Sequence, residues 1–321
     1  MKPVHQFSVL VLAAVFILIL CPFFGAEKLK LEDLFVPLSA SHRIFFELRL
    51  PRVVLTLVVG GSLAMLGGTY QSLLQNPLAD PYILGVSSAV TLAAASAELF
   101  FKIPSYSFVG VAIGFVAAWI VTCLLIGLSL SRTGAVDRLI LFGIGINFVL
   151  SSLLFLILSY FSQQMGGGSL RWLFGQISWI TLKESFLFLA VCFPFVMFIS
   201  LYSRALDALS LGDGVARTLG YSPERIRIIF LMATSVLVSL IVSVTGAIGF
   251  VGLVIPHGVR LIFHPSTNRT WLHLSFLAGG VFLCLSDVFS RLILPPFEFP
   301  IGIVTTLIGG PLFLFLLWKR S

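Results

Sequence analysis

Charged side chains are scarce in this sequence. Asp, Glu, Lys and Arg make up 10% of its 321 residues, hydrophobic residues make up 58%, and the mean hydropathy is +1.09. A soluble domain carries roughly a quarter charged residues, so the composition excludes an ordinary soluble protein and indicates a protein of the lipid bilayer. The net charge of +7 is scattered over loops, not gathered on a lysine-rich face, so we expect no nucleic-acid partner.

Several motifs of enzymes are also missing. There is no GxxxxGK[S/T] phosphate-binding loop, and none of the six lysines follows a glycine, which excludes ATPase chemistry of that kind on this chain. The four cysteines stand alone in apolar runs. His257, His264 and His273 lack a cysteine or carboxylate at metal-ligand spacing. We therefore expect no catalytic residue, no metal ligand and no cofactor on this chain, and an intramembrane enzyme is not favoured.

Long apolar runs fill most of the chain. At about 20 apolar residues per membrane helix, charges and prolines divide the sequence into ten segments: 5–25, 51–71, 82–101, 106–130, 138–161, 185–203, 226–245, 252–263, 271–292 and 302–318. The eighth is too short to span alone and is bracketed by Gly246, Gly249, Gly252 and Pro256, so we expect a broken or re-entrant helix. The first exceeds a signal-peptide core and is predicted to be a membrane helix.

Arginine and lysine predict the orientation of these helices. An even number of spans places both termini on one side, and that side holds 11 of the 20 Lys and Arg residues. Because such residues favour the cytoplasmic side, both termini are predicted to be cytoplasmic. Small residues recur four apart at Gly60, Ala64 and Gly68, and again at Gly110 and Gly114, a spacing typical of closely packed membrane helices. We predict one transmembrane domain, residues 1–321.

Two polar segments interrupt the apolar pattern. In QSLLQNPLADPYILG, residues 71–85, Pro77 and Pro81 each remove a backbone donor and end the second span. Residues 203–227 form the largest loop predicted on the cytoplasmic side. Its glycines divide a partly amphipathic pattern, which predicts two short helices lying across the membrane surface; a solvated linker is the alternative.

The second segment carries a family resemblance. LSLGDGVARTLG resembles the cytoplasmic coupling segment of the permeases in binding-protein-dependent ABC importers for iron-siderophores, haem and cobalamin. RLPR with NPLADPYILG, GFVGLVIPHGVRL and LSDVFSRLILPPFEFPIGIVTTLIGGP also match that family, in the expected order. The resemblance covers most of the chain.

The resemblance implies an all-α fold of ten membrane helices with a cytoplasmic pair of coupling helices. It implies a second permease copy, two separate ATPase subunits that hold ATP and Mg²⁺, and a periplasmic or lipid-anchored substrate-binding protein. The second copy could instead be a related permease. The expected location is the bacterial inner membrane, in contact with lipid. The cargo would be a bulky metal chelate, with an iron-siderophore favoured over haem or cobalamin.

The resemblance also assigns roles to individual residues. It places binding-protein docking at Arg49, Arg52 and Arg291, the cytoplasmic gate at Asn76, Leu78, Val136 and Asp137, the pathway lining at Gly143, Asn147 and Ser151, and ATPase coupling at Asp207, Leu209, Leu211, Gly212, Ala216, Leu219 and Gly220.

Each assignment has a simpler alternative. Arg291 could pair internally with Asp287, four residues earlier, and the other arginines could contact lipid phosphates. The gate loop could be a plain turn, and Asn147 could make an ordinary interhelical hydrogen bond. An ion-coupled secondary transporter is the competing function, with Asp287 as its one candidate buried charge.

Overall fold

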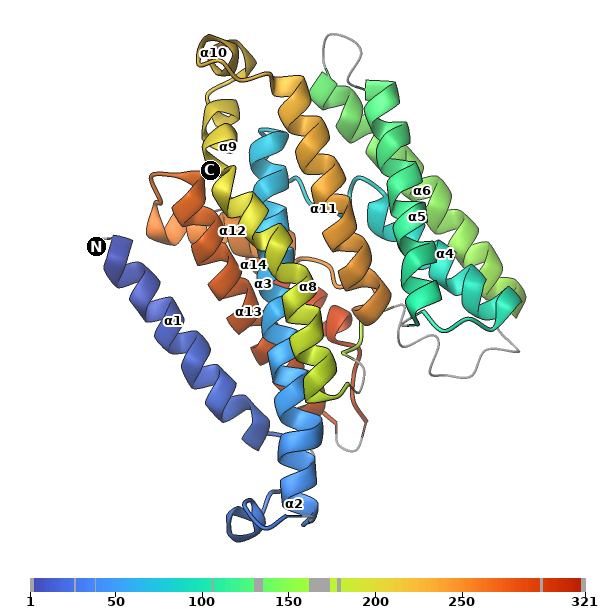
Figure 1. The fold of residues 1–321 in the computed structure, drawn as a ribbon, viewed down its shortest axis with the longest axis vertical. Helices are drawn as coiled ribbons and strands as arrows, with labels where there is room; N and C mark the ends of the chain where they lie inside the picture. The colour runs from blue at the N-terminus through green and yellow to red at the C-terminus, as the bar shows by residue number, and fades with distance from the viewer. Residues whose placement is uncertain are drawn as a thin grey trace. The chain divides into compact units, whose positions relative to one another are not determined.

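Helices make up most of the described structure. The computed structural model describes residues 3–25, 27–37, 39–105, 107–129, 135–161, 174–177, 180–294 and 297–318, and these contain no β-strand beyond one isolated bridge between Leu294 and Phe297. The helices are α1 (Pro3–Leu20), α2 (Ala40–His42), α3 (Leu50–Leu73), α4 (Val86–Phe101), α5 (Phe108–Ser129), α6 (Ala135–Phe161), α8 (Leu182–Leu201), α9 (Ser203–Ser210), α10 (Asp213–Thr218), α11 (Pro223–Thr245), α12 (Val251–Phe263), α13 (Asn268–Leu292) and α14 (Ile301–Trp318) (Figure 1).

Each of the ten predicted segments lies on a helix of this structure. Among the described residues six helical segments are long and apolar enough to cross a membrane: Ala40–Leu73, Phe108–Ser129, Val136–Tyr160, Leu182–Leu201, Pro223–Thr245 and Asn268–Leu292. The first of them joins α2 to α3 through a π-helical segment, Arg43–Arg49. Four shorter apolar helices accompany them: Phe7–Phe23, Val86–Phe101, Val251–Phe263 and Ile301–Leu316. The chain is an all-helical, multi-pass membrane protein.

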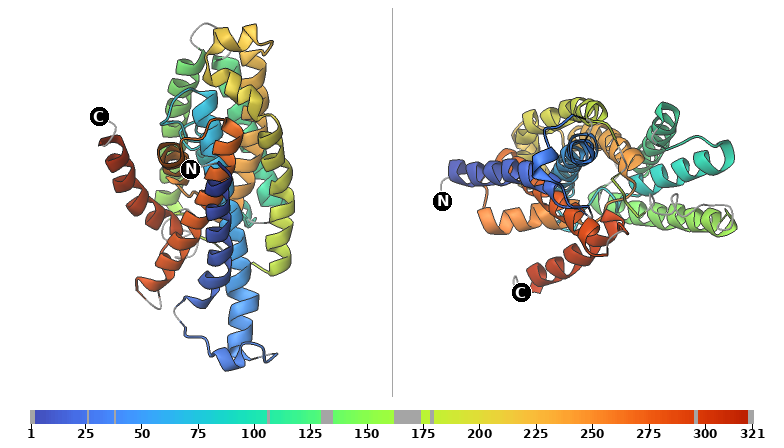
Figure 2. Two further views of the ribbon diagram at one scale, coloured as in Figure 1. Left: turned by 90° about the vertical axis from the view of Figure 1, so that its left-hand side faces the viewer. Right: turned by 90° about the horizontal axis from the view of Figure 1, so that it is seen from below.

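The helices fall into two compact units. The first comprises Met1–Gly68, Ile177–Ser200 and Gly249–Ser321, and the second comprises Thr69–Gln176 and Leu201–Ile248. In the first unit α13 contacts α1, α12 and α14; in the second, α4, α5 and α6 contact one another and α11 contacts α4 and α5. Figure 2 shows both groups from two further directions. The single domain expected from the sequence stays a prediction.

Glycines set the helix spacing in the first unit. A side chain on Gly60 of α3 would run into the backbone of Gly279 on α13, and one on Gly279 would meet Ala64. One on Gly67 would overlap the backbone of Gly252 on α12. Of the small residues predicted from their four-residue spacing, Gly60 is therefore a point where two helix backbones approach closely, whereas a side chain on Gly68 would meet that of Leu272.

The short eighth helix is confirmed. The chain leaves α11 at Thr245, and Gly246 and Phe250 both have positive φ before α12 begins at Val251. Pro256 lies inside α12 and has no N–H to donate. The Trp271 indole on α13 donates to the Pro256 carbonyl at 2.8 Å, so α12 is tied to α13 by a buried hydrogen bond.

Candidate functional site

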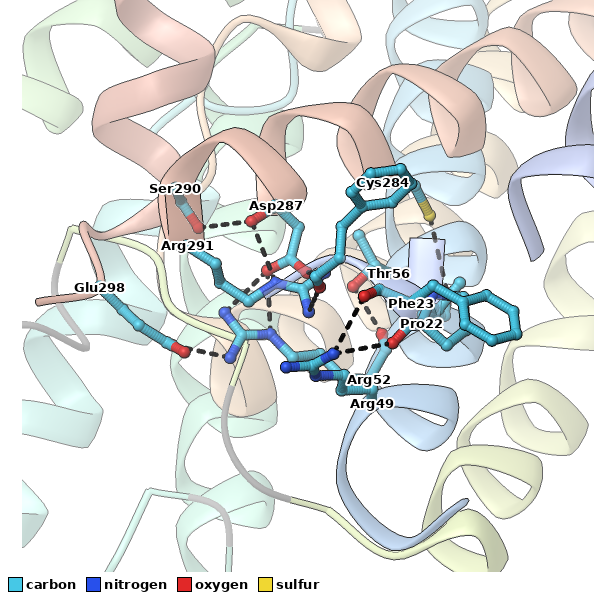
Figure 3. Close-up of polar contacts among 12 residues, drawn as sticks. Pro22, Phe23, Arg49, Arg52, Thr56, Cys284, Asp287, Ser290, Arg291 and Glu298 are labelled. Atoms are coloured by element: carbon cyan, nitrogen blue, oxygen red, sulfur yellow. Dashed lines mark hydrogen bonds and ion pairs between the residues drawn. The ribbon is translucent and has the colours of Figure 1, made fainter. Parts of the chain in front are cut away.

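Three arginines of the first unit gather around one carboxylate, where α3 and α13 lie beside the end of α1 (Figure 3). Asp287 on α13 is almost fully buried. Arg52 contacts its Oδ1 atom through Nε at 2.9 Å and Nη2 at 2.8 Å, and Arg291 approaches its Oδ2 atom at 3.0 Å. Arg52 also binds Glu298 at 2.8 Å. Asp287 thus pairs with two guanidinium groups, and Glu298 supplies the second negative charge.

Arg49 is held by the backbone. It is 7% exposed and donates to the carbonyls of Pro22 and Phe23, each at 3.2 Å, and to that of Glu27 at 2.6 Å. Arg291 reaches the same segment, with a hydrogen bond to the Phe24 carbonyl at 3.0 Å. The arginines therefore fix the chain that follows α1, and the network of three cations and two carboxylates keeps one excess positive charge.

This arrangement bears on the roles predicted for the three arginines and for Asp287. The predicted alternative, an ion pair between Arg291 and Asp287, is confirmed. Docking of a binding protein would use exposed side chains, whereas Arg49 and Arg291 are buried and Arg52 is mostly covered. Their binding-protein docking role stays a prediction. Asp287 is ion-paired with Arg52 and with Arg291, so it does not resemble an open proton or sodium site.

In the second unit, the loop between α3 and α4 is built from tight turns. Gln75 has a φ of 48°, and the Asn76 N–H donates to the Gln71 carbonyl at 3.2 Å, which ends the helix. The Asn76 side chain accepts from the Leu78 N–H at 2.9 Å, and Leu78 is exposed. The loop therefore contains a tight turn, and the apolar side chain of Leu78 at this turn is exposed.

The next residues of this loop are buried. Asp80 is buried and accepts a hydrogen bond from the Tyr82 N–H at 2.8 Å. Burial raises the pKa of Asp80 from about 3.8 to about 6, and the hydrogen bond from Tyr82 opposes that rise. The Tyr82 hydroxyl accepts from the Ile248 N–H at 3.1 Å, at the end of the second unit. This part of the loop is consequently fixed by buried polar contacts.

The other predicted gate residues lie on the first turn of α6. Val136 is half-buried and Asp137 is exposed. No hydrogen bond or ion pair among the described residues joins either of them to Asn76 or Leu78. Their role in a gate stays a prediction.

Asn147 on α6 makes an interhelical hydrogen bond, which was the predicted alternative to a pathway-lining role. Its side-chain oxygen accepts a hydrogen bond from Ser88 on α4, and the Ser151 hydroxyl lies 3.5 Å from that of Ser88. Gly143 is buried, and a side chain there would meet Leu84. Sequence reasoning missed Ser88, which no motif distinguishes. Asn147 and Ser151 keep partial exposure, and a pathway-lining role for them and for Gly143 stays a prediction.

The segment 203–220 forms the two short helices that its pattern predicted, α9 and α10. Gly212 separates them with a φ of 104°, and Gly220, with a φ of 85°, ends the second. Both are conformations that glycine adopts without strain. The Tyr221 N–H donates to the Ala216 carbonyl at 2.9 Å and closes the last turn.

The predicted coupling residues divide into two sets. Leu209 and Ala216 are completely buried within the chain, and Asp207 is half-buried. A coupling role for them stays a prediction. Leu211 and Leu219 are 65% and 57% exposed. Val215, which sequence reasoning did not single out, is 43% exposed and lies four residues from each. Leu211 at the end of α9, Val215 on α10 and Leu219 at the end of α10 are thus three exposed apolar side chains of the helix pair.

Known proteins resemble the chain over nearly its whole length. Residues 11–319 match the FecCD transport family. The chain is 36% identical to the vitamin B12 import system permease protein BtuC of Vibrio cholerae, over 88% of this chain and 85% of that protein. It is 35% identical to an iron chelatin transport system permease protein of Helicobacter pylori, over 96% of each. A solved structure of a metal-chelate type ABC transporter in an inward-facing conformation has a TM-score of 0.84 and 26% identity, covering 99% of this chain and all of that one.

Proposed function

Because the chain belongs to the FecCD transport family, we propose that it is the membrane permease of an ABC importer that moves a bulky metal chelate into the cytoplasm. The energy comes from ATP hydrolysed by two separate subunits. A substrate-binding protein delivers the cargo, and a second permease copy completes the pathway. The observation that carries the proposal is the match over residues 11–319, since it includes the second half of α1 and every later helix described above.

The helices support this membrane arrangement. Six helical segments are long and apolar enough to span by themselves, and four shorter ones are apolar. We propose that all ten cross or enter the bilayer of the bacterial inner membrane, with both termini in the cytoplasm. In that orientation α9 and α10 lie on the cytoplasmic side, where ATPase subunits would bind.

The exposed side chains of Leu211, Val215 and Leu219 are the surface that we assign to the ATPase. These three apolar side chains lie on a short polar segment. Their burial against a partner would remove apolar surface from water and so stabilise a complex. The chain itself needs no catalytic group for this role. It transmits motion between an outward-facing and an inward-facing state. Each partner shifts the balance between these two states only by binding one of them more tightly than the other.

The cargo is proposed from chemistry and from relatives. Proteins similar to this chain are named for vitamin B12 and for iron chelatin import. Both substrates are large metal complexes whose metal is already coordinated, so the permease needs only a wide, weakly binding wall. We favour an iron-siderophore, with cobalamin and haem as the competing cargoes.

The test reconstitutes the chain with its ATPase and its binding protein in proteoliposomes. The first measurement is co-purification of the ATPase with the native chain and with a variant in which Leu211, Val215 and Leu219 are changed to serine. A matched control changes Leu285 of α13, another exposed leucine, to serine. We expect the triple variant to lose the ATPase and the control to keep it.

The second measurement is uptake of a ferric siderophore, haem and cobalamin, each with ATP and with an ion gradient alone. ATP-dependent uptake of one chelate supports the proposal and identifies the cargo. Failure of any ATPase to bind the native chain would overturn it, and uptake driven by an ion gradient alone would favour a secondary transporter.

A further inference from the structure

We propose that Arg227, Asp213 and Gln75 are positioning residues that connect the helix pair α9–α10 to the α3–α4 loop and convert movement of the pair into movement of the loop. The inference rests on the proposed function, because it explains how an ATPase bound at α9 and α10 would reach the pathway. All of the residues concerned belong to the second unit.

Arg227 is the centre of this connection. It lies near the start of α11 and is 1% exposed. Its Nη1 and Nη2 atoms each donate to one oxygen of Asp213, the first residue of α10, at 2.7 Å, and its Nε atom donates to the Leu73 carbonyl at 3.2 Å. A forked guanidinium bound to both oxygens of a carboxylate resists rotation as well as separation. The start of α10 is thereby fixed to the last residue of α3.

The same contact changes the acidity of its partner. The hydrogen bonds from Arg227 hold the pKa of Asp213 below its ordinary value, so the carboxylate stays charged at neutral pH. The pair therefore persists at neutral pH.

Gln75 makes a second link to the other short helix. Its side-chain amide donates to the Leu209 carbonyl, in the last turn of α9, at 2.6 Å. Gln75 occupies a left-handed conformation, with a φ of 48°, at the position that ends α3. Glycine takes this position most often, and a residue with a side chain is strained there. The strain is understandable if the side chain is needed for the contact with α9.

The two links converge on three consecutive residues. Leu73 and Gln75 flank the point where α3 becomes the loop, directly before the turn formed by Asn76 and Leu78. The neighbouring ion pair of Arg217 and Glu224, at 2.5 Å, is exposed and does not reach the loop. A displacement of α9 or α10 therefore passes to the loop through Arg227 and Gln75, whereas the exposed pair carries none of it.

The experiment measures ATP hydrolysed and chelate taken up in the same proteoliposomes, using whichever of ferric siderophore, haem or cobalamin the native complex imports. The variants are Asp213→Asn, which keeps the shape of the side chain, Asp213→Glu, which restores the charge, and Gln75→Ala. The control is Glu224→Gln, which breaks the exposed pair. Rates are divided by the amount of intact complex, so a loss of folded protein does not count.

We expect Asp213→Asn to raise the ATP consumed per chelate about tenfold, with hydrolysis little changed, and Gln75→Ala to raise it by a smaller factor of about three. Asp213→Glu should recover part of the coupling, and Glu224→Gln should keep the native ratio. If hydrolysis and uptake fall by one common factor, or the ratio stays native, the inference is overturned. Should Asp213→Asn fail to fold, the exposed Gln75→Ala still decides. A native complex that hydrolyses no ATP would overturn the proposed function and this inference together.

Discussion

Asp287→Asn should destabilise the chain strongly, although it changes one atom. The carboxylate faces Arg52 and Arg291, and removing its charge leaves two buried guanidinium groups with less compensation. Breaking a buried ion pair by removing one partner costs roughly 3–5 kcal/mol. Arg52 keeps Glu298 and Arg291 keeps the Phe24 carbonyl, so we expect the lower end, about 3 kcal/mol, or roughly a 150-fold change in the unfolding equilibrium.

The assay is equilibrium unfolding in mixed detergent micelles, followed by tryptophan fluorescence. The control is Glu47→Gln, since the Arg43–Glu47 pair is 3.7 Å long and about 60% exposed on both sides. An exposed pair of this kind is worth less than about 1 kcal/mol. If Asp287→Asn and Glu47→Gln have equal effects, the reasoning that the buried network stabilises the chain by charge compensation is wrong.

Two further predictions concern buried positions. The pKa of Asp80 is raised to about 6, above its value near 3.8 when exposed, so its contribution to stability is fully present below about pH 4 and is lost as the pH rises through 6. Native protein should gain stability from pH 7.5 to pH 5 relative to Asp80→Asn, and equal pH profiles would contradict this. Gly67→Ala should cost about 3 kcal/mol in the same unfolding assay, because the new side chain overlaps the Gly252 backbone. Gly127→Ala, which meets no atom within 4 Å, should be neutral or stabilise by up to about 1 kcal/mol; a Gly67→Ala variant as stable as Gly127→Ala would rule out the close approach.

Helix positions followed from the sequence because their signals are local. Hydropathy and prolines placed all ten apolar segments on helices, and the glycines before residue 252 predicted the break between α11 and α12. The two short helices at 203–218 were also predictable, since Gly212 divides a pattern that is otherwise helical. The boundaries moved by a few residues at most places, as expected where a helix end depends on tertiary contacts.

Long-range partners did not follow from the sequence. Arg52 and Asp287 are 235 positions apart, and nothing near either residue reveals the other. Leu209 and Leu211 looked equivalent, yet one is buried and the other exposed, because residues two positions apart on a helix do not share a face. The family resemblance assigned candidate roles to these residues, but it did not show which of them are buried. The structure shows which residues are buried and which residues they contact.

The glycine contacts between α3 and α13 limit how the protein can change over evolution. At most helix interfaces a larger side chain on one helix can be accommodated by a smaller one opposite. Gly60 and Gly279 each face the backbone of the other, so shortening a nearby side chain, such as that of Ala64 or Leu283, leaves these backbone contacts in place. A second substitution on the opposite helix therefore cannot fully rescue an enlarged residue here, and these positions should accept mutations only when the two helix axes separate.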